Sequence, residues 1–105
     1  MASNSTTIHK LQQAINSHGG RLLYSTSQFY SDETNRPITI YQIRESFWDE
    51  EKRKNRSREL FKSASQIQIV LFLRDYWYVM NGKELPTNNE TWNKIRPTIT
   101  LSKED

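Results

Sequence analysis

The sequence contains no cysteine, which excludes a disulfide scaffold and thiolate metal sites. Only two histidines are present, His9 and His18, and they are nine residues apart. At about 100° per residue, this spacing puts them on opposite sides of a helix. We therefore expect no paired-histidine metal site and no bound metal.

Glycine and proline are scarce as well, with three residues of each. The glycines at positions 19, 20 and 82 form no phosphate-binding loop, no dinucleotide-binding loop and no nucleophile elbow. Without cysteine or a histidine pair, nucleophilic catalysis has few candidate residues. We therefore expect a protein that is not an enzyme, with no cofactor and no small-molecule substrate.

Long apolar runs are also missing. The longest run of aliphatic and Phe residues, Ile69 to Leu73, falls far short of the ~20 residues that a membrane-spanning helix needs. The polar start of the chain is followed by no apolar segment of the kind found in export signals. We therefore expect a cytoplasmic location and no membrane partner. The 105 residues, 34% of them hydrophobic and 11% aromatic, suffice for one small core.

The N-terminal part of the chain predicts one helix. We expect residues 1–5 to be a disordered start and Thr6 or Thr7 to cap the helix. Three apolar residues recur at steps of three and four and so share one helix face: Ile8, Leu11 and Ile15. The glycine pair at 19–20 ends the helix, because glycine accepts a left-handed backbone.

An antiparallel β-hairpin is expected next. Residues 21–31 are rich in Tyr, Thr, Ser and Phe, and residues 38–47 alternate apolar side chains; both patterns are typical of strands. The polar segment 32–37 between them predicts the turn.

The segment from Trp48 to Asn81 contains no glycine and no proline, which favours one long central helix. Its helical apolar spacing includes Leu60, Ala64, Ile67, Leu71 and Tyr78. We expect the hairpin to pack on this helix around Ile67, Val70 and Leu71. An alternative stays open, because residues 66–73 also alternate as a strand would.

A short C-terminal helix is expected after the long one. Thr87 and Glu90 have the spacing of a capping box, which predicts a helix through Arg96. Residues 98–105 then form a short strand or a tail. The elements together predict an α+β fold with one small domain over residues 6–97: an N-terminal helix, an antiparallel β-hairpin, a long central helix and a short C-terminal helix.

Positive charge is concentrated in one stretch. The formal charge of the whole chain is only +3, but residues 52–62 carry six basic side chains and one acid. Such a segment can neutralise several phosphates, and the preceding Trp48 can stack on bases. The candidate residues for binding nucleic acid, or a protein that processes it, are Lys52, Arg53, Lys54, Arg56, Arg58, Lys62 and Trp48. The alternative interpretation is a solvated helix face, on which Glu51 pairs with a basic neighbour.

The three residues Glu50, Glu51 and Lys52 have a spacing seen in metal-dependent nucleases. Such a site needs a further carboxylate on a neighbouring strand, and the nearest candidate, Asp32, is expected at the far end of the hairpin. We therefore interpret the acidic pair as the favourable first turn of a helix.

A second feature is the aromatic triplet Tyr76, Trp77 and Tyr78. Three successive residues cover most of a helix circumference, so at least one ring is expected to be partly exposed. An exposed ring would serve as an anchor for a protein partner. The alternative is a helix buried on two sides, and a homodimer through the same helix is a further hypothesis.

Three stretches carry a resemblance to known proteins: LLYSTSQFYS at 22–31, RPIT at 36–39 and SQIQIVLFLRDYW at 65–77. Over about residues 8–96 the chain resembles small uncharacterised accessory proteins of plasmids, phages and cassette elements of low-GC Gram-positive bacteria. The resemblance implies a bacterial, cytoplasmic protein of a mobile genetic element, and it carries over no catalytic or binding residue. Proteins of this kind act by binding, either to nucleic acid or, as inhibitors or adaptors in the manner of anti-CRISPR proteins, to a host defence or replication protein.

Overall fold

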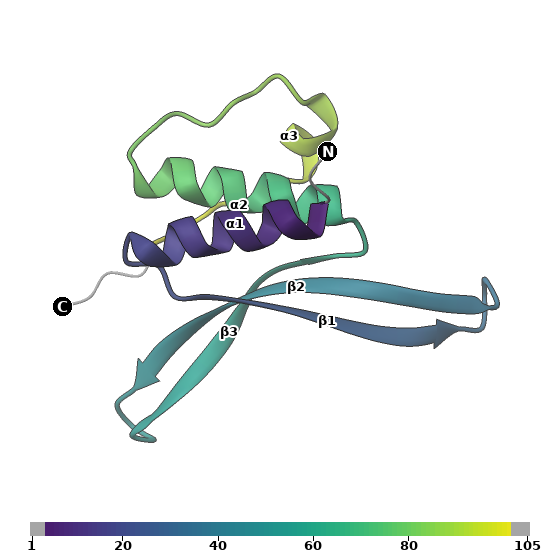
Figure 1. Cartoon of the computed structure of the whole chain (residues 1–105), viewed down its shortest axis with the longest axis horizontal. Helices are drawn as coiled ribbons and strands as arrows, with labels where there is room; N and C mark the ends of the chain where they lie inside the picture. Colours follow the sequence, from purple (N-terminus) through teal and green to yellow (C-terminus); the bar gives the residue numbers. More distant parts are fainter. Residues whose placement is uncertain (1–3, 102–105) are drawn as a thin grey trace.

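A computed structural model describes residues 4–101 of the chain. The protein is a small α+β domain in which a layer of helices covers one face of a three-stranded sheet (Figure 1). In chain order the elements are α1 (Asn4–Ser17), β1 (Leu22–Ser31), β2 (Arg36–Asp49), β3 (Lys54–Ser63), α2 (Gln66–Met80) and α3 (Glu90–Ile95).

The sheet is an antiparallel meander in the order β1-β2-β3. The central strand β2 has 14 residues, whereas each of its neighbours has 10. The β1–β2 pair begins at Leu22 opposite Glu45, while the β2–β3 pair continues to Asp49 opposite Lys54. Each hairpin therefore extends past the helices at its own end of the molecule, as Figure 1 shows.

The core lies between the helices and the middle of the sheet. Phe61 of β3 stacks on Phe72 of α2 with ring centroids 5.0 Å apart, and its edge meets Trp92 of α3 at 5.6 Å. The predicted apolar face of the first helix is confirmed, because Ile8 and Ile15 are fully buried and Leu11 packs against the core. The buried apolar residues are Ile8, Ile15, Leu22, Ile43, Ile69, Phe72, Leu73, Tyr76 and Trp92.

The prediction of one long helix from Trp48 to Asn81 is wrong. Residues 48–63 complete β2, turn, and return as β3, and the helix begins only at Gln66. Ser65 is its N-cap, and its side chain accepts a hydrogen bond from the backbone N–H of Gln68. Cross-strand pairing with β2 has overridden local helical spacing, since strands depend on partners that a local pattern does not reveal. The open question about residues 66–73 is settled in favour of helix.

Smaller expectations also need correction. Ile67 lies on the exposed side of α2 and is 59% exposed, so it is not central to the packing. The helix α1 begins at Asn4, so residues 4 and 5 are not a disordered start, while residues 1–3 lie outside the described part. The cap of α3 is Asn89 rather than the predicted Thr87. Residues 98–101 form no strand, and residues 102–105 lie outside the described part.

None of the helices between residues 4 and 101 is both long and apolar enough to cross a bilayer.

Candidate nucleic-acid interface

The basic segment forms the turn between β2 and β3 and then the strand β3 itself. Glu50 to Arg53 make the turn, in which the Asp49 carboxylate accepts a hydrogen bond of 3.1 Å from the backbone N–H of Lys52. Arg53 closes the turn with a left-handed backbone, at φ 50°. Lys52, Arg53 and Lys54 are all exposed there.

The turn between β1 and β2 is built in the same way. The Ser31 hydroxyl accepts from the backbone N–H of Thr34 at 3.4 Å, and Asn35 closes the turn at φ 56°. Asparagine tolerates a left-handed backbone, whereas arginine has no local interaction that favours it. The two turns therefore share a shape, but the β2–β3 turn holds a cation at its least favourable position.

Strand alternation divides the basic residues between the two faces of the sheet. The register places Arg56 opposite Phe47 and Arg58 opposite Glu45, on the face that carries the helices. Arg56 pairs with Asp49, with 3.0 Å between Nη1 and Oδ2, and Arg58 pairs with Glu45, with 2.7 Å between Nη2 and Oε1. Carboxylates of β2 thus engage two of the six candidate cations.

The pair formed by Arg58 and Glu45 joins an exposed arginine to a buried carboxylate. Glu45 is only 5% exposed, and its second carboxylate oxygen accepts a hydrogen bond of 3.0 Å from the Tyr76 hydroxyl. Burial, together with the neighbouring negative charge of Glu45, raises the pKa of Tyr76 to about 12. Arg58 therefore compensates a buried carboxylate, and we assign it a structural role.

The other face of the sheet carries no helix among the described residues, and we call it the open face (Figure 1). A β-bulge between Ile43 and Arg44 leaves Leu60 without a direct partner, so Lys62 lies opposite Gln42 on this face. Trp48 also lies on the open face by register, opposite Asn55, and is 49% exposed.

Sequence reasoning missed two further cations on the open face, Arg36 and Arg44, which the register places on the same side as Lys62. The Nε and Nη2 atoms of Arg44 donate to the hydroxyl and the carbonyl oxygen of Ser57, at 2.9 and 3.0 Å. The alternation of residues 38–47 could have placed Arg44 on the face of Ile38 and Ile40, but the position of β3 was needed to bring Lys62 to the same face.

The acidic pair Glu50 and Glu51 is exposed in the β2–β3 turn rather than in a helix turn. Asp32 lies in the other turn, beyond the opposite end of β2, so the structure does not bring it to the acidic pair. Across residues 4–101, no three His, Asp or Glu side chains gather as a group that could hold a metal ion.

The aromatic triplet lies on α2 and faces inward for the most part. Tyr76 is 3% exposed and contributes to the core, while Trp77 and Tyr78 are half-buried. Trp77 packs edge-on against His18 at 4.8 Å between ring centroids. The structure thus leaves Trp77 and Tyr78 as the two partly accessible rings of the triplet.

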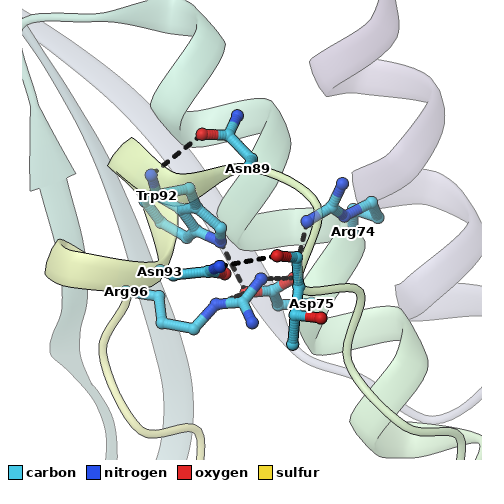
Figure 2. A network of polar contacts seen from close by, with 7 residues as sticks. Arg74, Asp75, Asn89, Trp92, Asn93 and Arg96 are labelled. Carbon is cyan, nitrogen blue, oxygen red and sulfur yellow. Dashed lines mark hydrogen bonds and ion pairs between the residues drawn. The ribbon is translucent and has the colours of Figure 1, made fainter.

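A polar network around Asp75 fastens α3 to α2 (Figure 2). Asp75 is 1% exposed and accepts a hydrogen bond of 2.7 Å from the indole N–H of Trp92. Arg74 and Arg96 approach the same carboxylate, each with a nitrogen 3.2 Å from an oxygen. These contacts stabilise the helical layer, and the indole of Trp92, 1% exposed, fills the core below the last helix.

Comparisons of this chain with protein-family models, with curated proteins and with solved structures find no match.

Proposed function

We propose that this protein is a non-enzymatic accessory binding protein of a mobile genetic element that contacts nucleic acid through the tip of the β2–β3 hairpin. The observation that supports the proposal is the set of exposed cations at this tip, Lys52, Arg53 and Lys54, beside the half-exposed ring of Trp48. The hairpin holds them clear of the helical layer (Figure 1).

The tip has the chemistry that phosphates require. No carboxylate pairs with the side chains of Lys52, Arg53 or Lys54 within residues 4–101. Cations that are not already paired can replace counterions along a phosphate backbone, which makes binding favourable and sensitive to salt. Glu50 and Glu51 in the same turn limit the net charge, so we expect dissociation constants on the order of micromolar at physiological salt.

The backbone of Arg53 adds support to this assignment. A left-handed conformation costs a non-glycine residue about 1 kcal/mol, and the matching position of the other turn holds the better suited Asn35. A residue kept in an unfavourable conformation points to a use for its side chain. At the end of a hairpin, that use is contact with a partner.

The test is a titration of the protein with labelled single- and double-stranded DNA and RNA at low and at physiological salt. The key variant reverses three charges at the tip: Lys52→Glu, Arg53→Glu and Lys54→Glu. The matched control reverses three exposed lysines on the helical side and so has the same net charge: Lys10→Glu, Lys83→Glu and Lys94→Glu. We expect binding to be lost in the tip variant and largely kept in the control.

Equal loss in both variants would mean that net charge alone determines binding, and would overturn the role of the tip. If the wild-type protein binds no nucleic acid even at low salt, the proposal fails. The alternative is then an inhibitor or adaptor that acts on a host defence or replication protein, and a pull-down from host extract would be the next experiment.

A further inference from the structure

The open face of the sheet carries large exposed apolar side chains among its polar residues. Leu23, Phe29 and Trp48 lie on it by register and are 47%, 51% and 49% exposed. Ile38, directly opposite Phe29, and Ile40 are half-buried on the same face. The water-facing side of a two-layer protein normally carries polar residues, so the three exposed apolar side chains point to a binding surface.

The same face is positively charged. It carries three cations, Arg36, Arg44 and Lys62, and one carboxylate, Glu59, which gives a net charge of +2. Glu59 accepts a hydrogen bond of 2.6 Å from the side-chain amide of Gln42 beside it. The three cations are spread along the face, and Arg44 lies near its middle, held by Ser57.

The charge of the open face and its exposed aromatic rings indicate which kind of partner would bind there. A second copy of this chain, packed face to face, would bring two surfaces of net charge +2 together, which is unfavourable. Duplex nucleic acid is anionic but keeps the faces of its bases stacked inside. A single strand supplies both a negative backbone and free base faces, which stack on aromatic side chains.

We infer that the open face binds single-stranded nucleic acid, with bases stacked on Trp48 and Phe29 and phosphates near Arg44 and Lys62. The inference rests on the proposed function and extends it from the hairpin tip onto the sheet. Along β2, the distance from Ile38, the cross-strand partner of Phe29, to Trp48 is ten residues, or about 34 Å. This length suits several nucleotides, which matches small domains that bind single strands.

The chain offers a matched pair of variants for the test. Phe29 and Tyr30 are adjacent exposed aromatic residues of β1, 51% and 58% exposed, but they lie on opposite faces of the sheet. Phe29→Ala removes a ring from the open face, whereas Tyr30→Ala removes one from the helix side. Because both rings are exposed, neither substitution removes a core contact, and circular dichroism checks that both variants are folded.

The experiment measures the affinity of the full chain for a labelled DNA strand of about 12 nucleotides and for the corresponding duplex. We expect the wild-type protein to bind the single strand about tenfold or more tightly than the duplex. Phe29→Ala and Trp48→Ala should each weaken single-strand binding by about 5- to 100-fold. Tyr30→Ala should change single-strand affinity by less than about twofold, because the Tyr30 ring lies on the other face of the sheet.

The outcomes separate this inference from the proposed function. If the wild-type protein binds neither form, the proposed function itself fails. If the duplex binds as tightly as the single strand, or if Phe29→Ala leaves affinity unchanged, the inference is overturned while binding through the hairpin tip stands. Equal loss in Phe29→Ala and Tyr30→Ala would also overturn it, because the effect would then not be specific to the open face.

Discussion

The cations on the two faces of the sheet have different surroundings. On the helix side, Arg56 and Arg58 are matched with carboxylates of β2, and one of these pairs extends into the core through Tyr76. On the open face, Lys62 is exposed and the half-buried Arg44 donates to Ser57, and exposed aromatic and aliphatic side chains share this face. The difference teaches that cations close together in sequence lie in different environments: Arg56 and Arg58 are paired with carboxylates, whereas Lys62 is exposed on the face for which we propose binding.

The strongest test of the stabilising side is Asp75→Ala, because Asp75 holds α3 and Trp92 in the helical layer. Removing the buried carboxylate leaves the Arg74 and Arg96 guanidinium groups without their shared partner. We expect the free energy of unfolding to fall by about 3–5 kcal/mol, measured by urea denaturation. As a control, Glu59→Ala on the open face should change it by less than about 0.5 kcal/mol. A loss below about 1 kcal/mol for Asp75→Ala would contradict the role given to the network.

Alkaline pH tests the buried contact between Tyr76 and Glu45. The pKa of Tyr76 is raised to about 12 in the folded protein, against 10.0 for an ordinary tyrosine, so the folded state holds this proton more tightly. Its contribution is therefore fully present below pH 10 and is lost as the pH rises toward 12, by on the order of 2–3 kcal/mol.

The measurement compares unfolding of the wild-type protein and Tyr76→Phe between pH 9 and 12, and only the wild type should show this extra loss. Burial also raises the pKa of Tyr24, but that residue is present in both proteins, so their difference isolates Tyr76. Parallel curves for the two proteins would show that the Tyr76 hydroxyl is not coupled to folding.

A pair of substitutions on β3 separates the two roles of its cations. Arg58→Gln weakens the compensation of the buried Glu45, so we expect a loss of about 1–3 kcal/mol in the free energy of unfolding and little change in nucleic-acid affinity. Lys62→Gln should do the opposite: stability within about 0.5 kcal/mol of the wild type, and a salt dependence of binding reduced by about one phosphate contact. If the two variants changed stability and nucleic-acid affinity in the same way, the two cations would not have the different roles that we assign to them.

The smallest expected effect concerns the β2–β3 turn. Arg53→Asn gives this turn the residue that closes the other one, at a nearly identical backbone angle. We expect the free energy of unfolding to rise by up to about 1 kcal/mol, because asparagine tolerates the left-handed region, while affinity for nucleic acid falls. Loss of stability in thermal unfolding would show that the Arg53 side chain has a structural role after all.

Elements whose signals lie within a few residues could be predicted from the sequence. The apolar spacing of Ile8 and Ile15 predicts α1, and the turn-rich segment 32–37 predicts the first hairpin, because both signals lie within a few residues. The strand β3 was missed, because its residues alternate cations with polar groups and its stability comes from pairing with β2, not from an apolar pattern of its own.

The candidate site was affected by the same error. With residues 52–62 placed on a helix, the sequence predicts that all six cations act together. The register shows that Arg56 and Arg58 are engaged by Asp49 and Glu45, residues that lie before the turn. Which acid opposes which base depends on the pairing of two strands, and that pairing could not be derived without recognising the turn at Arg53.

The bulge at Leu60 determines which side chains of β3 face the helices. From Lys54 to Arg58, even-numbered residues point to the helices, but after the extra residue it is odd-numbered Phe61 that points inward and even-numbered Lys62 that points out. A strand without this one-residue change of phase would turn Phe61 toward water and Lys62 toward Phe72. One inserted residue thus lets a single strand place arginines and an aromatic ring on the same side of the sheet. Inserting or deleting a residue in β3 would therefore exchange the inward and outward side chains on one side of the change, which a single substitution would not do.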